Sequence, residues 1–313
     1  MFTTIDCEYL HPQVGAAYLL EEAGEVAFVE TNTAHALPHL LGALARAGRR
    51  VEEVRYVIVT HAHLDHAGGA AALMARCPGA TLLCHPRAAR HLIDPTRLVA
   101  SSIQVYGAEA FARLYGTVAP IPEARVRTLE DGATVTLGSR TLRFLHTLGH
   151  AKHHFVVHDE RFGTVFTGDA FGLVYPFLQH AGRLAFPSTS PTDFDFEEAV
   201  KAVQRIVALR PTEVCLTHFG GYPDAAAIAA QLTWWLEQSQ AAVEACIERG
   251  RREDAIPFLK ERLSAAMEVA LRRTGLAPSA AERAFLEMDL DLNSQGLSWA
   301  VSRKVPAPKR PPP

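Results

Sequence analysis

The sequence predicts an α/β protein with two sheets, helices outside them, and a helical segment at the C-terminus. Apolar runs of strand length dominate residues 1–60 and again residues 125–170, and helical patterns follow each region. Only helical patterns occur after residue 223. The 313 residues, of which 48% are hydrophobic, supply enough apolar material for one large domain with an appendage.

The first region leads from strands into a histidine-rich run. Residues 14–20 and 25–31 are apolar runs joined by turn-forming residues, which predicts a hairpin. Residues 36–47 carry leucines at helical spacing and end before a glycine, which predicts a helix. Residues 54–60 are apolar and rich in β-branched side chains, as in a buried strand. The histidine-rich run Thr60–Gly69 starts where this strand ends.

The rest of the chain predicts further elements and one boundary. In order, we expect a helix at 67–76, a strand at 81–84, mostly helix over 87–115, strands at 125–129, 133–137, 141–147, 155–157 and 164–167, a helix at 195–209, a strand at 213–217, and helices at 224–249, 255–274 and 279–288. Residues 1–221 are therefore the expected catalytic domain. Residues 222–313 are a helical extension, whose end, 306–313, is a loose tail rich in Pro, Lys and Arg.

Composition narrows the classes of function. The formal net charge is −3 and no basic block occurs, so a nucleic-acid partner is not expected. The five cysteines are scattered, which disfavours a disulfide framework or a thiolate zinc site. Neither a secretory signal nor an apolar stretch of about 18 residues is seen, so we expect a cytoplasmic protein without a membrane span.

Four side chains of the metal-ligand type lie within six residues of the run: His61, His63, Asp65 and His66. Two histidines that are two residues apart point the same way just beyond a strand. Gly68 and Gly69 allow the chain to bend sharply afterwards. Imidazole and carboxylate together suit Zn²⁺, Fe or Mn²⁺. The alternative, a polar turn with incidental histidines, is disfavoured because three more strand ends supply ligands.

Those three ligands are His150, Asp169 and His218. Each follows an apolar segment of strand type and has a glycine close by. A single histidine after a strand is usually a hydrogen-bonded structural residue, but side chains at several strand ends can be held together by a rigid scaffold. The three residues, in this order after the run, predict one shared metal site.

This pattern resembles the metallo-β-lactamase fold superfamily, whose signature HxHxDH is followed by a His, an Asp and a His. The resemblance spans residues 1–221. It implies a four-layer αββα sandwich with the metals at one edge of the two sheets. It also implies two sets of metal ligands joined by a bridging carboxylate. The first set is His61, His63 and His150, the second is Asp65, His66 and His218, and the bridging residue is Asp169.

Such a site predicts hydrolysis at a carbonyl. Two divalent ions carry four positive charges, and Asp65 and Asp169 neutralise two of them. The remaining charge favours a bridging hydroxide, since metal binding lowers the pKa of water to about 7. Asp65 additionally orients this nucleophile or accepts its proton. We therefore expect a binuclear metal-dependent hydrolase that attacks an ester, thioester or lactone. Its cofactors would be two divalent ions, foremost Zn, with Fe or Mn as alternatives.

Departures from the superfamily pattern leave the subfamily open. Many members carry Asp-Thr-Gly near the end of an early strand, where this chain has Glu30-Thr31-Asn32. Glu30 is either a support for the ligands or a solvated strand end. Glyoxalase II enzymes read GHTxGH around the fifth ligand; here His154 keeps the second histidine, but Lys152-His153 disfavours a close match. His63 stands where flavodiiron proteins carry Glu, which argues against them.

The segment 171–191 is the candidate substrate loop. It follows Asp169 and is long, irregular and apolar, as functional loops often are. It either forms a wall over the metals or packs on the helices of 87–115 or on a partner subunit. The residues expected to bind substrate are Phe171, Tyr175, Phe177 and His154.

Other functions stay open at this level. A mononuclear iron persulfide dioxygenase would use only the His61, His63, His150 and Asp169 positions. A nuclease, an exported β-lactamase and a purely structural metal site rank lower. We expect a small-molecule substrate as the partner, and a homodimer through the helical extension stays open.

Overall fold

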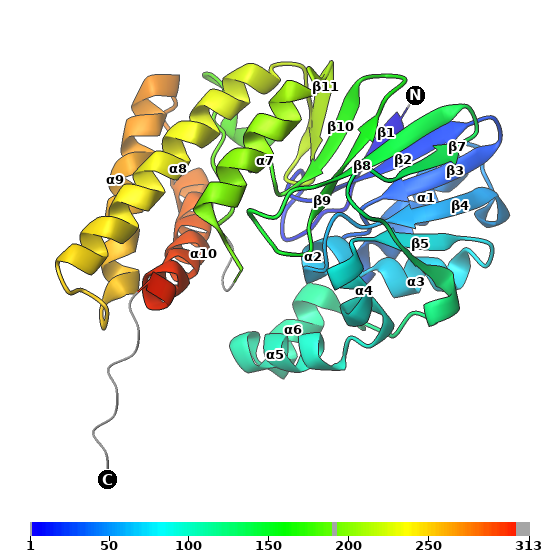
Figure 1. Ribbon diagram of the computed structural model, residues 1–313, viewed down its shortest axis with the longest axis horizontal. Coiled ribbons are helices and arrows are strands. Elements are labelled where there is room, and N and C mark those ends of the chain that lie inside the picture. Colours follow the sequence, from blue (N-terminus) through cyan, green and yellow to red (C-terminus); the bar gives the residue numbers. More distant parts are fainter. Residues whose placement is uncertain (1, 190–192, 305–313) are drawn as a thin grey trace, which may run out of the picture.

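The computed structural model describes residues 2–189 and 193–304 and confirms the predicted architecture, with two mixed sheets flanked by helices and a C-terminal helical segment (Figure 1). The predicted tail, 306–313, and the end of the candidate substrate loop, residues 190 and 191, lie outside the described residues. The first sheet has the strand order β1 (Phe2–Asp6), β2 (Ala16–Glu22), β3 (Glu25–Val29), β4 (Val54–Ile58), β5 (Thr81–Cys84) and β6 (Val126–Thr128). The second has the order β12 (Gly220–Tyr222), β11 (Glu213–Leu216), β10 (Thr164–Gly168), β9 (Phe155–Asp159), β8 (Arg140–His146) and β7 (Thr134–Leu137).

Strand alternation gives the sandwich its layers. In β2, Ala17 and Leu19 belong to the apolar cluster outside the first sheet, whereas Tyr18 and Leu20 belong to the cluster between the sheets. Successive side chains of a strand point to opposite faces, so one strand contributes to both clusters. Parallel pairing of β3 to β6, and of β10 with β11, brings their C-terminal ends to one edge.

Helices cover both outer faces. On the first sheet these are α1 (Leu37–Arg46), α3 (Ala70–Arg76) and α4 (Pro86–Ile93), and the short α2 (Leu64–Ala67) precedes α3. On the second sheet they are α7 (Phe196–Ala208) and α8 (Ala225–Glu248). A separate pair, α5 (Thr96–Tyr106) and α6 (Ala108–Tyr115), lies beside the sandwich (Figure 1). The expected helical stretch 87–115 is thus three helices.

The helical extension consists of α8, α9 (Ala255–Thr274) and α10 (Ala280–Lys304). Its buried residues form one apolar cluster with α7 and the outer face of the second sheet. The prediction that the last helix ends at residue 288 is wrong, because α10 continues to Lys304. Leu290 and Leu297 are buried in that part, so packing against the extension holds it helical. β12 spans the predicted boundary at residue 221.

Two expectations from composition concern the whole chain. All five cysteines are free and buried. Among the described residues, no helix combines the length and the apolar character that crossing a membrane requires.

Candidate metal centre

The histidine-rich run begins where β4 ends. Thr60 and His61 are fully buried, and the chain then enters α2, in which His66 is fully buried as well. A Cβ at Gly69 would lie 2.6 Å from the carbonyl oxygen of Thr31. Glycine therefore lets the run pack against the residues that follow β3.

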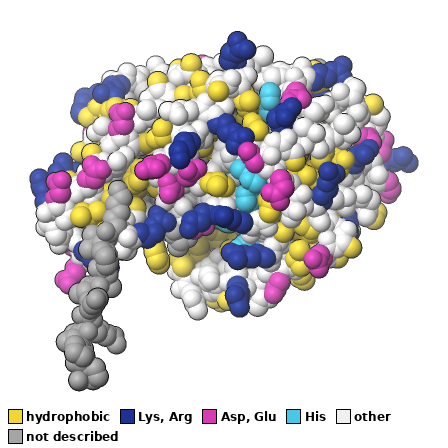
Figure 2. Space-filling view, in the orientation of Figure 1, with side chains coloured by type: hydrophobic (Ala, Val, Ile, Leu, Met, Phe, Trp, Pro, Cys, Tyr) yellow, Lys and Arg dark blue, Asp and Glu magenta, His cyan; other side chains and the backbone are white. Residues whose placement is uncertain are grey.

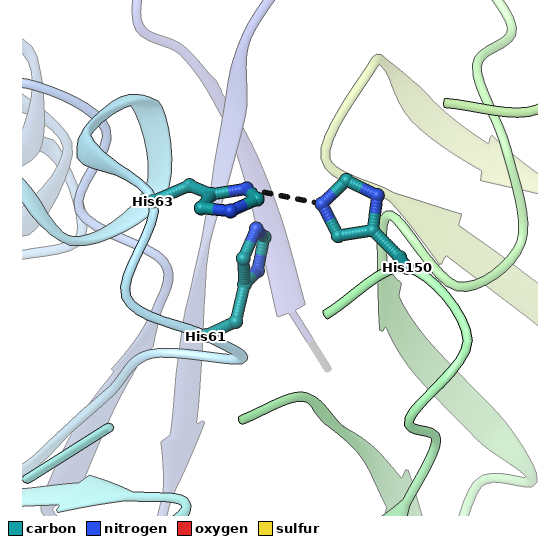
Figure 3. A group of neighbouring side chains, drawn as sticks. All are labelled: His61, His63 and His150. Atoms are coloured by element: carbon teal, nitrogen blue, oxygen red, sulfur yellow. Dashed lines mark hydrogen bonds between the residues drawn. The ribbon is translucent and has the colours of Figure 1, made fainter. Parts of the chain in front are cut away.

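The other three predicted ligands come from the second sheet. His150 lies between β8 and β9, Asp169 directly follows β10, and His218 follows β11. In Figure 3, His150 points toward His61 and His63 from the opposite side, so that the three rings converge. The structure thus brings residues that are far apart in the sequence to one point between the sheets.

The ligand atoms fall into two triads joined by a carboxylate. We call His61, His63 and His150 the first triad, and Asp65, His66 and His218 the second triad; in each, one ligand atom per residue lies within 4.8 Å of the others. A third group of the same kind joins Asp169 to His61 and His66, one member of each triad. Asp169 Oδ1 lies 3.1 Å from His66 Nε2, and Asp169 Oδ2 lies 3.4 Å from His150 Nε2.

Backbone carbonyls orient two of the rings. His150 Nδ1 is 3.1 Å from the carbonyl oxygen of Ser188. His218 Nδ1 is 2.9 Å from the carbonyl oxygen of Val14. A carbonyl oxygen only accepts hydrogen bonds, so each Nδ1 carries the proton and each Nε2 is left as the metal-ligating atom.

Glu30 lies beneath the run as a buried support. Its side chain is 1% exposed, which excludes the alternative of a solvated strand end. Its Oε1 accepts a hydrogen bond from the Thr60 hydroxyl and lies 3.4 Å from His66 Nδ1. Thr60 Oγ1 is in turn 3.0 Å from His61 Nδ1. One carboxylate therefore makes an ionic contact with a ring of the second triad and reaches a ring of the first triad through Thr60.

Several inner atoms of the site make no hydrogen bond. His61 Nε2, His66 Nε2 and Asp169 Oδ1 are buried and have no hydrogen-bond partner, although the last two lie 3.1 Å apart. Leaving such atoms unpaired in the interior costs about 1–3 kcal/mol each. They face one another and are nitrogen and carboxylate donors, so the residues fit a metal centre.

The two triads differ in their electrostatic environment. Burial opposes ionisation of Asp169, but His66, His150 and His218 outweigh it and hold the pKa of this carboxyl well below its usual range. Burial likewise disfavours a charge on His66, yet Asp169 and Asp65 raise the pKa of its ring well above the usual value. His61 faces other histidines, and burial together with these neighbours lowers its pKa well below the usual value. Negative charge is thus concentrated on the side of the second triad.

The four residues expected to bind substrate have different positions. Tyr175 lines the cavity over the triads. Phe171 is fully buried in the apolar cluster with α8, and Phe177 stacks on Tyr175 with ring centroids 5.6 Å apart. His154 is fully buried and its Nε2 accepts a hydrogen bond from the backbone N–H of Asp169 at 3.2 Å. These three do not line the cavity, and His154 instead holds the backbone of Asp169.

The cavity has a volume of about 290 Å³ and opens above the ligands. Its floor contains His63, Asp65, His150, Asp169 and His218. Both helices of the α5–α6 pair contribute to its walls, as do α10 and the loop after Asp169, through which Tyr175 and Ser188 reach the site.

Sequence reasoning missed the part of the cavity that α10 supplies. Phe285, Met288, Asp289 and Leu292 all line it. They stand at positions i, i+3, i+4 and i+7, the spacing of one helix face. That spacing was the available signal, but it runs across residue 288, where the helix was expected to end.

Comparison with known proteins places this geometry in a family. The sequence pattern described as the metallo-beta-lactamase superfamily matches residues 12–218, more than half of the chain. The chain belongs to this superfamily. The match confirms the resemblance seen in the ligand pattern, and it ends at the last predicted ligand, His218.

Two curated relatives share about a quarter of their aligned residues with this superfamily member. The metallo-beta-lactamase fold-containing protein ST1585 of Sulfurisphaera tokodaii is 25% identical over 173 residues, which cover 54% of this chain and 62% of the relative. The match therefore spans less than two thirds of that relative. The uncharacterized protein YobT of Bacillus subtilis is 26% identical over 203 residues, or 64% of this chain and 81% of YobT.

Solved structures share the superfamily fold. The crystal structure of ST1585, described as an archaeal metallo-beta-lactamase superfamily protein from Sulfolobus tokodaii, has a TM-score of 0.61 at 22% identity and covers 76% of this chain and 86% of its own. The family protein TTHA1429 from Thermus thermophilus has a TM-score of 0.60 at 23% identity and covers 88% of this chain and 93% of its own. At these identities the likeness concerns the fold.

Proposed function

We propose that this protein is a binuclear metallohydrolase that cleaves an ester, thioester or lactone of a small molecule. The observation that carries the proposal is the two-sided position of Asp169, whose Oδ1 faces the second triad and whose Oδ2 faces the first. A carboxylate that faces two triads suits a pair of ions, whereas a single ion would leave one triad without a role.

Two divalent ions are the proposed cofactors, with zinc foremost because its usual donors are those of the two triads. Iron or manganese would accept the same nitrogen and oxygen donors. When bound, the ions supply a water that ionises near neutral pH and polarise the substrate carbonyl.

The protein supplies orientation and proton transfer. Asp65 lines the cavity, and its Oδ2 lies 3.5 Å from His218 Nε2. Its other oxygen, Oδ1, is the proposed acceptor of the proton from the attacking water. Tyr175 and the apolar walls position the substrate and displace water from it.

Metal-loaded protein tested on a panel of esters, thioesters and lactones checks the proposal. We expect two metal ions per chain and turnover of at least one class. His61→Ala and Asp169→Ala each remove a ligand and should lower kcat/KM by at least about 100-fold. His180→Ala is the matched control, because His180 is a surface histidine paired with Glu282. Turnover that survives His61→Ala, or the absence of turnover across the panel, would contradict the proposal.

The same preparation distinguishes the proposed hydrolase from the alternative, a mononuclear iron dioxygenase. That reaction needs only His61, His63, His150 and Asp169, and it assigns nothing to Asp65 and His218, which line the same cavity. One iron per chain together with oxygen uptake on addition of a persulfide would replace the hydrolase by the dioxygenase.

A further inference from the structure

Among the described residues that line the cavity over the metal centre, Asp289 is the one carboxylate that is not a predicted metal ligand. None of these residues is Lys or Arg, so no such side chain compensates its charge. On the face drawn in Figure 2, Lys and Arg side chains are spread over the outer surface.

The outer part of the cavity is apolar and open to solvent. Met288 and Leu292 of α10 are 46% and 43% exposed, and Tyr106 of α5 is 42% exposed, although all three line the cavity. Exposed apolar side chains that are grouped at a concave surface mark a binding site. Since this surface continues inward to the metal ligands, the occupant that fits it is the apolar part of the substrate.

Tyr175 connects the apolar wall to the ligands. Its ring is 4.9 Å from that of Phe285 on α10 and 6.4 Å from that of His218, measured between centroids. Its hydroxyl donates a hydrogen bond to Asp289 Oδ1 at 3.3 Å. Asp289 therefore stands where the apolar wall meets the metal centre.

Asp289 disfavours the binding of anions in this region. Its Oδ2 is buried and has no hydrogen-bond partner. A substrate carboxylate placed against the α10 wall would lose water, meet no Lys or Arg among the described residues and face the charge of Asp289, and each of these effects is unfavourable. An uncharged acyl or aryl group would meet Phe285 and Met288 without such a cost.

We propose that the cavity accepts uncharged carbonyl substrates with an apolar acyl or aryl group, and that Asp289 excludes substrates that carry a carboxylate on that group. This inference rests on the proposed hydrolase function and names its substrate class. Asp289 acts by repulsion, which is a common source of specificity beside direct attraction.

Matched substrates test the inference in the metal-loaded protein. Two aryl esters with the same leaving group and equal acyl length are compared, one ending in a methyl group and the other in a carboxylate. The assay is run at pH 8, because burial raises the pKa of Asp289 to about 7. Wild-type kcat/KM should favour the neutral ester by at least about 100-fold, since like charges brought together cost several kcal/mol.

Asp289→Asn removes the charge and keeps the shape of the side chain. It should reduce the preference for the neutral ester by about 10-fold, mainly by lowering KM for the anionic ester. Asp291→Asn is the matched control, because it makes the same change on the same helix, and Asp291 pairs with Lys260 outside the cavity. We expect this control to leave the preference unchanged.

Binding of amide analogues that the protein does not hydrolyse, measured by calorimetry, tests this inference separately from the proposed function. The neutral analogue should bind more tightly than the carboxylate analogue, whether or not esters are hydrolysed. If esters are hydrolysed without a neutral preference, or if Asp289→Asn leaves the preference intact, the inference is wrong and the hydrolase proposal stands. If no ester is hydrolysed but the neutral analogue binds preferentially, the hydrolase proposal fails and the assignment of the cavity stands.

Discussion

Glu30 shows how one residue outside the ligand set shapes the whole site. It has a φ of +69°, in the left-handed region that non-glycine residues rarely adopt. Such a conformation costs roughly 1–3 kcal/mol and persists where the surroundings enforce it. Here it turns the carboxylate beneath the run, where it contacts Thr60 and His66. The strained backbone is therefore coupled to the orientation of both triads.

Replacement of Glu30 by Gln tests this role. The amide keeps the size of the side chain but loses the charge that faces His66 Nδ1 at 3.4 Å. Metal affinity should fall by about 10- to 100-fold, the usual cost of losing a partner behind a ligating histidine. Competition with a chelator of known affinity measures the change.

Glu52→Gln is the control. It makes the same change at an exposed position and should leave metal affinity unchanged. An affinity for metal in Glu30→Gln equal to that of the wild type would show that His66 is oriented without this carboxylate.

At the scale of elements, α10 contacts the metal centre through the candidate substrate loop. Asn293 Oδ1 accepts a hydrogen bond from the backbone N–H of Thr189 at 2.7 Å, and its Nδ2 donates to the carbonyl oxygen of Pro187 at 3.0 Å. Between these two residues lies Ser188, whose carbonyl oxygen contacts His150. A helix of the C-terminal extension thus holds the turn that orients a ligand of the first triad.

Asn293→Ala should release this turn. We expect metal affinity to fall by about 10-fold, less than for Glu30→Gln because Asn293 acts on His150 through one more contact. Metal content after dialysis against a chelator reports the loss, and circular dichroism verifies that the helices are retained.

Gln295→Ala replaces an amide on the same helix that does not line the cavity, and it should retain metal like the wild type. If Asn293→Ala retains metal as well as the wild type does, His150 keeps its position without the hydrogen bonds that Asn293 makes to the turn.

The elements that sequence reasoning recovered and missed differ in a physical way. The run from His61 to His66 was predictable because its spacing and the preceding strand are local properties. The end of α10 was not, since Asp291, Asn293 and Ser294 are weak helix formers that packing overrides. Asp289 joins the site only through tertiary contact with Tyr175, which no local pattern records. His154 was interpreted as a substrate contact because its sequence position places it near the site. The sequence does not say on which side of Asp169 it lies, and the structure places it behind the Asp169 backbone.

At the scale of the molecule, the metal centre joins the two sheets. Residues from the end of β4 meet residues from the ends of β10 and β11. A bound ion therefore cross-links the two sheets through side chains of both, in addition to the apolar cluster between them. The cytoplasmic location stays a prediction, and a homodimer through the helical extension stays an open possibility.

Removal of metal should lower the stability of the entire fold. An ion that binds only the folded protein and is present at about 1,000 times its dissociation constant adds about 4 kcal/mol. Thermal unfolding with and without a chelator should show a decrease in Tm of several degrees. Asp169→Ala should show little change on chelation, and a wild-type Tm that does not respond to metal would contradict the cross-link.

The distance along the chain between His66 and His218 has a consequence for how the protein is made. About 150 residues separate them, and at roughly 5–20 residues per second their synthesis takes roughly 10–30 s. Throughout that interval the nascent chain has Asp65 and His66 without His218, which completes the second triad, whereas His150, which completes the first triad, is made about half-way through it. Metal capture in its final geometry must therefore wait until β11 has left the ribosome, and the wall that α10 adds to the cavity is made later still.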